Sequence, residues 1–351
     1  MAEDVYGELA DALDRLPNGF PRTSSGVEIS ILKRIFTPEE ATLASHLGRE
    51  MEPVDCIAQR IGIPAEKVKT RLTDMAKRGL VWFDERDGEL WFRLAPFVVG
   101  FYESQLKNMD HEFAHLVERY LADGGAVGIM KPQPALHRVV PSQRAVKSEW
   151  ILPYDDVKAI IQAGRTFSLR DCICRVQQDH VGRRCNFPLK TCLSFSSRER
   201  PPRQDDISKE EALAFLDESE RIGLVHTVSN VMEGLFYVCN CCGCCCGILR
   251  GINEWGIENS VAHANYYSVI NADECVNCGL CIDRCQVHAI SEMGGAAVID
   301  RKRCIGCGLC VTGCPTGAAR LQVKSGEEII HPPVNFETWE KDRLRNNGLI
   351  K

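Results

Sequence analysis

The sequence predicts an α+β protein of two or three domains, with its chemistry concentrated in the second half of the chain. Its 351 residues exceed the roughly 150 residues of one typical domain. Helical spacing and one hairpin pattern dominate the first half, whereas 18 of the 19 cysteines follow position 171. The apolar share of 44% and the charged share of 26% are ordinary for a globular protein, which excludes disorder and a fibrous architecture.

The sequence also predicts the compartment. The opening MAEDVYGELADALDRL lacks the basic and apolar regions of a secretory signal. No window approaches the roughly 18 uninterrupted apolar residues that predict a membrane span. We therefore expect a cytoplasmic protein, in which thiols stay reduced and clustered cysteines indicate metal or redox chemistry. The net charge of −6 offers no bulk attraction to nucleic acid.

Residues 1–121 show mainly helical patterns. A leading helix is expected over residues 3–16, because its apolar residues recur at helical spacing until the Pro17–Pro21 run. Residues 29–94 predict three helices, with Gly62 at a turn between two of them. Alternating apolar residues around Asp87-Gly88 then predict a hairpin.

The stretch 29–94 resembles the winged helix-turn-helix domain of MarR-like regulators, and the resemblance implies that fold. Its second helix, over residues 64–79, carries five cations: Lys67, Lys69, Arg71, Lys77 and Arg78. The whole stretch nevertheless holds as many acids as bases, which is weak for a surface that binds phosphates. We therefore favour a module that docks a partner protein or forms a homodimer, and DNA is the unlikely partner.

Residues 101–121 predict a further amphipathic helix. Its apolar stripe comprises Leu106, Met109, Phe113, Leu116, Val117, Tyr120 and Leu121. His111 and His115 have a metal-ligand spacing, but no further ligands accompany them, so a solvated face is favoured. The Pro- and Gly-rich residues 122–153 predict a linker, which is followed by a cysteine-rich metal-binding domain at 154–268. A second cysteine-rich domain at 269–324 and a tail at 325–351 complete the chain.

Two copies of one cysteine spacing occur near the C-terminus: Cys275-x2-Cys278-x2-Cys281-x3-Cys285 and Cys304-x2-Cys307-x2-Cys310-x3-Cys314-Pro315. Three cysteines on a tight turn can bind three irons of one cubane, while the fourth cysteine reaches the neighbouring cubane. One cluster then takes Cys275, Cys278, Cys281 and Cys314, and the other takes Cys304, Cys307, Cys310 and Cys285. Residues 270–323 closely resemble bacterial-type two-[4Fe-4S] ferredoxins, which implies a ferredoxin-like module with two [4Fe-4S] clusters.

Two details of these motifs concern the backbone. Gly279 and Gly308 follow the second cysteine of each motif, where a glycine permits close approach to a cluster. Pro315 matches the family pattern, whereas Gln286 stands where the first motif usually has a proline. This departure leaves ligation intact but puts the backbone conformation after Cys285 in question.

Ten further cysteines lie in the middle of the chain: Cys172, Cys174, Cys185, Cys192, Cys239, Cys241, Cys242, Cys244, Cys245 and Cys246. Six of them fall within the eight residues 239–246, a density that core packing does not explain. We expect one or two further Fe-S clusters here. A metal-free patch of redox-active thiols and a zinc site are the alternatives.

Two resemblances bear on this middle region. Cys241-Cys242-Gly243 is similar to the CCG motif of heterodisulfide-reductase-like subunits, without that family's later CxxC. The Cys172-x-Cys174-Arg175 segment, together with the 239–246 window, is more similar to a poorly characterised 4Fe-4S domain that is fused to ferredoxin modules in anaerobes.

The segment between Arg165 and Arg203 is strongly basic, with nine Lys or Arg residues against three acids. Its guanidinium groups could offset the negative charge of a thiolate-bound cluster, or they could bind an anionic partner. His180 and His226 are the histidines nearest the middle cysteines in sequence, and each is a candidate for a non-cysteine ligand.

No GxGxxG, P-loop or Ser-His-Asp signal is present, which disfavours a nucleotide-binding Rossmann unit or a hydrolase. Flavin is not excluded, because flavin sites often lack a short motif. The sequence therefore predicts a multi-cluster iron-sulfur protein that transfers electrons to or from a partner oxidoreductase in anaerobic metabolism. Its catalytic residues, if any, are unknown. The alternatives are a redox-responsive winged-helix regulator and an Fe-S reductase with an open cluster site in the middle domain.

Overall fold

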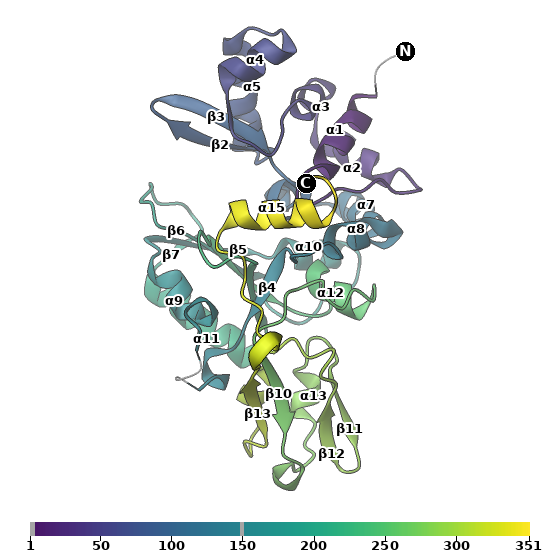
Figure 1. The fold of residues 1–351 in the computed structure, drawn as a ribbon, viewed down its shortest axis with the longest axis vertical. Coiled ribbons are helices and arrows are strands. Elements are labelled where there is room, and N and C mark those ends of the chain that lie inside the picture. The colour runs from purple at the N-terminus through teal and green to yellow at the C-terminus, as the bar shows by residue number, and fades with distance from the viewer. Residues whose placement is uncertain (1–3, 148–150) are drawn as a thin grey trace. The chain divides into compact units, whose positions relative to one another are not determined.

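The computed structural model describes residues 4–147 and 151–351 (Figure 1). The chain divides into two units. Unit 1 comprises the described residues up to Ile129 together with Val176–Gly182 and Leu344–Lys351, and unit 2 comprises the described residues of Met130–Arg175 and Arg183–Arg343. The predicted cysteine-rich domain and the predicted ferredoxin module therefore both lie in unit 2, apart from residues 176–182.

Unit 1 begins with a set of helices: α1 (Val5–Asp14), α2 (Val27–Ile35), α3 (Pro38–Ser45), α4 (Val54–Ile61), α5 (Ala65–Lys77) and α7 (His111–Tyr120). The predicted leading helix is confirmed, and Asp4 caps it by accepting a hydrogen bond from the Gly7 amide. Gly62 ends α4 in the left-handed conformation, as the predicted turn requires. Buried aromatic rings around Phe97 and Tyr120 fill the centre of the unit.

Unit 1 also contains a three-stranded antiparallel sheet, with the order β1 (Glu52–Pro53), β3 (Glu89–Leu94), β2 (Val81–Arg86). The predicted hairpin is confirmed, since β2 and β3 pair over their whole lengths. Asp87 and Gly88 both have positive φ, which matches the right-handed twist of a two-residue hairpin turn.

The prediction of a single helix over residues 101–121 is wrong. The segment contains α6 (Tyr102–Ser104), a 3-10 turn (Leu106–Asn108) and, after a break, α7. The physical reason is Asp110, whose side chain accepts a hydrogen bond from the Phe113 amide at 2.9 Å and so begins a new helix. Helical periodicity alone does not register such a cap.

Unit 2 is built on a six-stranded sheet in which every neighbouring pair is antiparallel. Its order is β4 (His137–Val140), β8 (Val225–Ser229), β9 (Tyr237–Cys241), β6 (Lys190–Ser196), β5 (Thr166–Asp171), β7 (Asp206–Ile207). Its helices include α9 (Val157–Gln162), α11 (Lys209–Ile222) and α12 (Gly247–Asn253). The residues of α8 (Ala126–Met130) and α10 (Ile173–His180) are divided between the two units.

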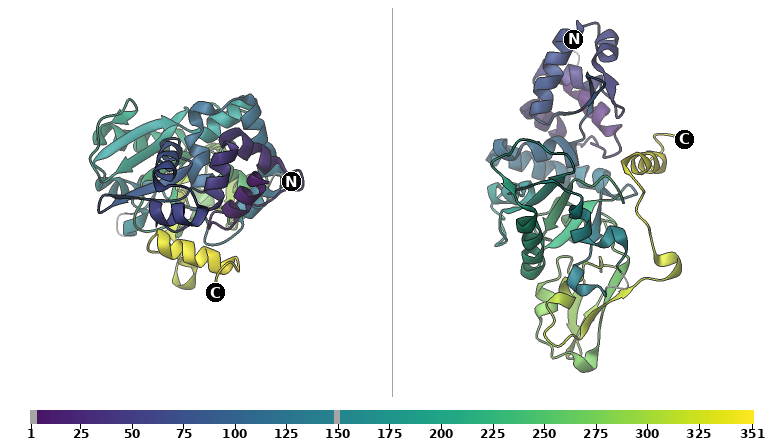
Figure 2. Two further views of the ribbon diagram at one scale, coloured as in Figure 1. Left: turned by 90° about the horizontal axis from the view of Figure 1, so that it is seen from above. Right: turned by 90° about the vertical axis from the view of Figure 1, so that its left-hand side faces the viewer.

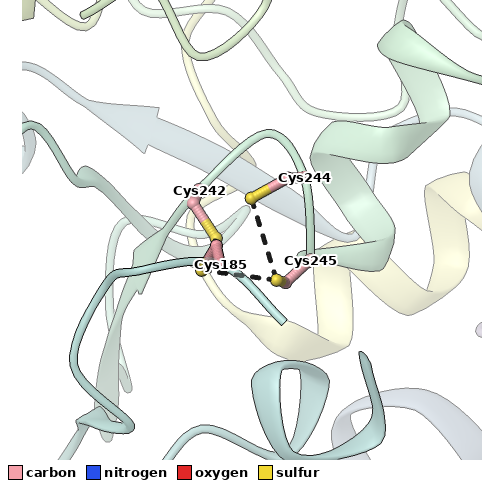
Figure 3. Close-up of side chains that lie close together, drawn as sticks. All are labelled: Cys185, Cys242, Cys244 and Cys245. Atoms are coloured by element: carbon pink, nitrogen blue, oxygen red, sulfur yellow. Dashed lines mark hydrogen bonds between the residues drawn. The ribbon is translucent and has the colours of Figure 1, made fainter. Parts of the chain in front are cut away.

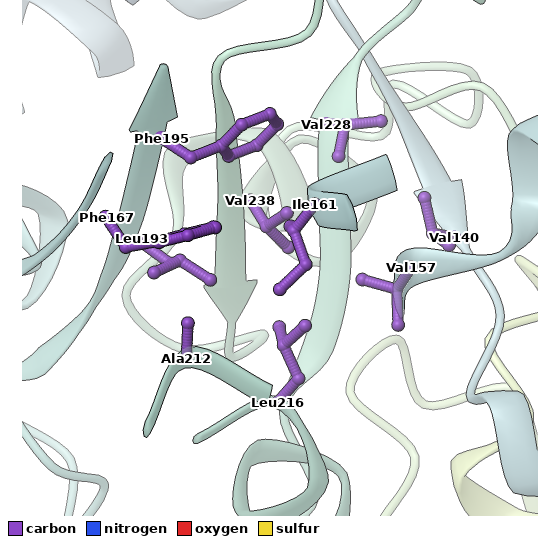
Figure 4. Close-up of a cluster of buried hydrophobic side chains, with 10 residues drawn as sticks. All are labelled: Val140, Val157, Ile161, Phe167, Leu193, Phe195, Ala212, Leu216, Val228 and Val238. Atoms are coloured by element: carbon purple, nitrogen blue, oxygen red, sulfur yellow. The ribbon is translucent and has the colours of Figure 1, made fainter. Parts of the chain in front are cut away.

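Helices α9 and α11 cover one face of the sheet (Figure 4). The core between them contains Val157 and Ile161 of α9, Ala212 and Leu216 of α11, and Val140, Phe167, Leu193, Phe195, Val228 and Val238 of the strands. Because side chains alternate along a strand, the neighbours of these core residues point to the opposite face. On β6 and β9 that opposite face carries cysteines.

The segment 122–153, predicted as a linker, contributes regular structure. It contains α8 and the edge strand β4, which pairs with β8. Strand β4 is only four residues long, only Val139 and Val140 in it are apolar, and prolines lie on both sides, so the Pro and Gly content concealed it. Residues 148–150 of this segment lie outside the described residues.

The region after α12 forms two small antiparallel sheets and two short helices. Strands β10 (Tyr266–Ile270) and β13 (Ala319–Val323) pair, as do β11 (Ile290–Met293) and β12 (Ala296–Ile299), and the helices are α13 (Leu280–Asp283) and α14 (Leu309–Thr312). The tail then runs back along unit 2 to α15 (Phe336–Asn346), as Figure 2 shows in yellow. The Met232 and Glu233 amides donate backbone hydrogen bonds to the tail. The Trp339 indole donates a further hydrogen bond to the Ala135 carbonyl oxygen.

Candidate metal centres

The first candidate centre is a cavity in the ferredoxin module. Three cysteines of the first motif line it together with the last cysteine of the second motif: Cys275, Cys278, Cys281 and Cys314. The remaining lining is mostly apolar, and the cavity is partly open to solvent. The exposed Cys278 thiol lies at its outer side. The donor set fits a [4Fe-4S] cluster, which needs four thiolates in a largely apolar setting.

The two motifs position their cysteines by the same backbone device. Asn277 and Gly306 occupy equivalent places, between the first and second cysteines, and both have positive φ. Gly279 and Gly308 also have positive φ, at the start of α13 and α14. At Gly306 a side chain is excluded as well, because a Cβ atom there would lie 2.3 Å from the Tyr266 carbonyl oxygen. Each loop therefore turns so that its thiols converge.

The second candidate centre joins the remaining ferredoxin cysteines. Cys285 of the first motif interacts electrostatically with Cys304, Cys307 and Cys310 of the second motif. This group is more buried than the first, and burial raises the pKa of Cys310 to about 12. The Ser268 hydroxyl lies 3.0 Å from the Cys310 sulfur. The structure thus places Cys285 near the three cysteines of the second motif, and the crossed ligand assignment stays a prediction from the spacing.

The residues flanking Cys285 attach the ferredoxin module to the six-stranded sheet domain. Arg284 donates hydrogen bonds to the carbonyl oxygens of Glu220 and Arg221, at the end of α11. Gln286 donates to the Gly223 carbonyl at 3.0 Å and accepts from the Gly243 amide at 2.8 Å. The residue that replaces the family's proline is therefore an anchor, because its side chain makes two bonds that proline could not make.

The ten middle cysteines separate into two groups. The first, which we call the four-cysteine group, comprises Cys185, Cys242, Cys244 and Cys245 (Figure 3). Cys185 comes from the loop before β6, and the other three come from the loop between β9 and α12. All four sulfur atoms lie within 4.8 Å of one another. Hydrogen bonds from the other three thiols lower the pKa of Cys185.

Apolar side chains and one guanidinium surround this group. Leu224, with the partly buried Phe187 and Ile222, packs against Cys242 and Cys245. The fully buried Arg175 side chain is hydrogen-bonded to Cys242 and interacts with Cys172 and Cys241. It also donates to Thr191 and, at 3.0 Å, to the Asn240 carbonyl oxygen, which holds it in place.

The second group, which we call the six-cysteine group, comprises Cys172, Cys174, Cys192, Cys239, Cys241 and Cys246. Cys172 is hydrogen-bonded to Cys174, Cys174 to Cys246 and Cys246 to Cys241, and Cys241 interacts with Cys172, which closes a ring of four. Cys239 is hydrogen-bonded both to Cys241 and to Cys192, and Cys192 lies directly opposite Cys239 on the neighbouring strand β6. These strand cysteines lie on the sheet face opposite to the α9–α11 core.

A buried polar network adjoins the six-cysteine group. The Thr227 hydroxyl lies 3.4 Å from the Cys241 sulfur and 3.4 Å from Nδ1 of His137. Nε2 of His137 is 2.8 Å from the Tyr237 hydroxyl, which also contacts Ser229. Burial lowers the pKa of His137 to about 4, so this imidazole is neutral at neutral pH.

The candidate histidines lie outside both groups. His226 bonds Asn240 at 2.7 Å and lies 3.4 Å from Glu220, on the α11 side of the sheet, so its proposed role as a ligand is wrong in this structure. His180 is exposed at the end of α10. His111 and His115 are exposed, and their ring centroids lie 4.4 Å apart with the rings tilted by 46°. Strand alternation explains the position of His226, because it is one residue away from Thr227.

The basic segment is mostly a surface feature. Arg175 contacts the cysteines, whereas Arg165 and Arg200 pair with Glu199 and Asp206. Neither His137 of β4 nor Thr227 of β8 was predicted from the sequence as a site residue. The alternation of β9 points to them, since Tyr237, Cys239 and Cys241 share one face, but their contact depends on long-range strand pairing.

Comparison with known proteins agrees with the ferredoxin module. A family model described as a 4Fe-4S dicluster domain matches residues 262–319. A search of curated proteins gives no match. Among the described residues, no helix has the length and apolar content that crossing a membrane requires. The chain therefore carries a C-terminal 4Fe-4S dicluster domain and further groups of cysteines, and it is an iron-sulfur protein of mixed helix and sheet.

Proposed function

We propose that this chain is a multi-cluster electron-transfer protein that exchanges electrons with a partner oxidoreductase. The observation that carries the proposal is the cavity in which Cys314 of the second motif joins Cys275, Cys278 and Cys281 of the first. This crossing is the ligand arrangement of two neighbouring clusters. When bound, each cluster takes up and releases one electron.

The two ferredoxin centres have different surroundings, which supports a direction along the module. Around the first centre, Cys278 is exposed and Val276 and Leu280 are 64% and 45% exposed. These apolar side chains next to a thiol offer a docking surface for a redox partner. At the second centre, Cys285 lies between Arg284 and Gln286, which bond to the sheet domain. Electrons would thus be exchanged at the exposed end and passed toward the sheet domain.

The ring of Cys172, Cys174, Cys241 and Cys246 is our candidate for one further Fe-S cluster. Backbone amides of Gly247 and Leu249 donate hydrogen bonds to Cys174 and Cys246, and such bonds stabilise the negative charge of thiolate ligands. The buried Arg175 guanidinium supplies a positive charge beside the ring. Cys192 and Cys239 adjoin it and remain candidates for further ligation. The proposed electron transfer does not need a flavin.

Unit 1 would bind the partner protein. The order of α3, α4, α5 and the β2–β3 hairpin supports a winged-helix module, as the resemblance implies. We propose that this module docks a partner oxidoreductase or a second copy of the chain. The anaerobic and cytoplasmic setting remains a prediction from the sequence.

A redox-responsive regulator is the second candidate function. Lys67, Lys69 and Arg71 are exposed on α5, as DNA contact would require. Against it, the hairpin tip exposes Glu85, Asp87 and Glu89, whose charges repel the DNA backbone. We therefore expect no salt-sensitive binding to the promoter of the protein's own gene. Nanomolar, cluster-dependent binding that Arg71→Ala abolishes would favour the regulator.

Iron analysis and EPR of anaerobically purified full-length protein test the proposed function. Two ferredoxin clusters and one in the six-cysteine group predict about 12 iron and 12 acid-labile sulfide per chain. Cys174→Ala should lose about a third of both and retain the signals of the two interacting ferredoxin clusters. Cys56→Ser, which changes an exposed cysteine of unit 1, is the matched control. Protein that is folded but holds no reducible cluster would refute the proposal.

A further inference from the structure

The four-cysteine group has the sulfur spacing of a single metal ion. The Cys185 sulfur lies 3.8 Å from that of Cys242 and 3.5 Å from that of Cys245. The sulfurs of Cys244 and Cys245 are 3.8 Å apart. A tetrahedral ion with metal–sulfur bonds of about 2.3 Å holds its ligand atoms about 3.8 Å apart. These three distances are close to that value, and the other three sulfur pairs lie within 4.8 Å.

A cubane requires a wider arrangement. Each of its four thiolates binds a different iron, so the iron–sulfide core separates the ligand sulfurs. The ferredoxin cysteines provide a comparison within the same chain. We compared sets of three or more His, Cys, Asp or Glu side chains in residues 4–147 and 151–351. The four-cysteine group is the one set whose ligand atoms all lie within 4.8 Å of one another. The cysteines that the motifs assign to cubanes are thus spread more widely than these four.

The loop that carries three of the four thiols is held without any metal contact. Asn253 donates to the Gly243 carbonyl at 3.1 Å, and Gln286 accepts from the Gly243 amide at 2.8 Å. A Cβ atom at position 243 would lie 1.9 Å from the Gln286 carbonyl oxygen, so glycine is required between Cys242 and Cys244. The geometry of the thiols is therefore set by the surrounding chain.

The surroundings also fit a closed structural site. Four thiolates around a divalent ion leave two negative charges, and the Arg175 guanidinium that contacts Cys242 offsets part of this charge. Leu224 and the neighbouring apolar side chains exclude water from one side. Cys244 is exposed, which leaves a path for the ion to enter. With four protein ligands, no position stays open for a substrate.

We infer that Cys185, Cys242, Cys244 and Cys245 bind one tetrahedral thiophilic ion, zinc or a single iron, and that they do not bind an Fe-S cluster. Binding displaces the thiol protons into solvent, and no electron is transferred. The site thereby fastens the loop before β6 to the loop after β9. This inference does not depend on the electron-transfer function proposed above.

Metal analysis of full-length protein tests the inference. Cys244→Ser and Cys185→Ser should each lose one metal ion per chain and retain all acid-labile sulfide, while Cys56→Ser retains both. Loss of one zinc identifies zinc, and loss of one iron without sulfide identifies a mononuclear iron; either outcome supports the site. Loss of iron together with sulfide, or no loss of metal, overturns it.

The wild-type protein gives a second measurement that requires no variant. A zinc ion with four sulfur neighbours at about 2.3 Å in X-ray absorption, or one iron in excess of the sulfide, supports the inference. Equal iron and sulfide in a preparation without zinc overturns it, because cubanes contain the two in equal numbers.

Discussion

The buried imidazole of His137 makes the stability of the sheet domain dependent on pH. His137 is 6% exposed, and both of its nitrogens contact neutral hydroxyls, those of Thr227 and Tyr237. Burial lowers its pKa from 6.5 to about 4. Because the unfolded chain takes up a proton that the folded chain refuses, stability falls as the pH falls from about 6.5 through about 4.

The magnitude follows from the linkage relation. With these two pKa values, acidification from pH 7.5 to pH 5.5 removes roughly 1.4 kcal/mol of stability, out of a total of roughly 3 kcal/mol at still lower pH. His137→Gln removes the titrating group and keeps a donor and an acceptor. The variant should therefore lack this part of the decline, although its stability at pH 7.5 is lower.

Urea unfolding under anaerobic conditions, followed by circular dichroism at both pH values, measures the difference. Contributions from other groups and from the metal centres are common to both proteins and cancel in the comparison. His115→Gln changes an exposed histidine and should decline as the wild type does. An equal decline in wild type and His137→Gln would refute the linkage argument.

Three further predictions concern the clusters and the turns. Cys314→Ala should remove the EPR signal of the cluster held by Cys275, Cys278 and Cys281; loss of the other cluster would contradict the crossed arrangement. Gln286→Ala removes two hydrogen bonds and should lower the free energy of unfolding by about 2 kcal/mol in anaerobic urea titrations. Gln322→Ala, which removes an exposed hydrogen bond to Tyr267, is the control and should change this free energy little. Gly88→Ala introduces a side chain at a φ of 80° and should destabilise unit 1 by roughly 1–2 kcal/mol in thermal unfolding, while Gly48→Ala, whose Cβ meets open space, should be tolerated.

Local features of this chain could be predicted from the sequence, and long-range ones could not. The hairpin follows from Asp87-Gly88 between alternating apolar residues, and the ferredoxin module follows from two cysteine spacings that need no partner elsewhere in the chain. The division of the middle cysteines depends on strand pairing instead. Cys192 meets Cys239 because β6 pairs with β9, 47 residues later, and no local pattern specifies that register.

The same limit explains the errors. His226 is close in sequence to the cysteines but lies on the other face of the sheet, since neighbouring residues of a strand point in opposite directions. The break before α7 depends on one hydrogen bond, which the Asp110 carboxylate accepts from the Phe113 amide. The sheet face of His226 and the cap at Asp110 are each properties of a single position, so neither can be read from counts of residue types.

The bond between Gln286 and Gly243 has a consequence for oxidative damage. Gly243 lies between Cys242 and the exposed Cys244, and Gln286 follows Cys285 directly. Oxidation of the Cys244 thiol would displace the loop that contains Gly243. Because Gln286 accepts a hydrogen bond from the Gly243 amide, this movement would also disturb the backbone next to Cys285. The most accessible thiol of the sheet domain is therefore linked through Gln286 to Cys285, a predicted cluster ligand of the ferredoxin module, so oxidation of the first would alter the surroundings of the second.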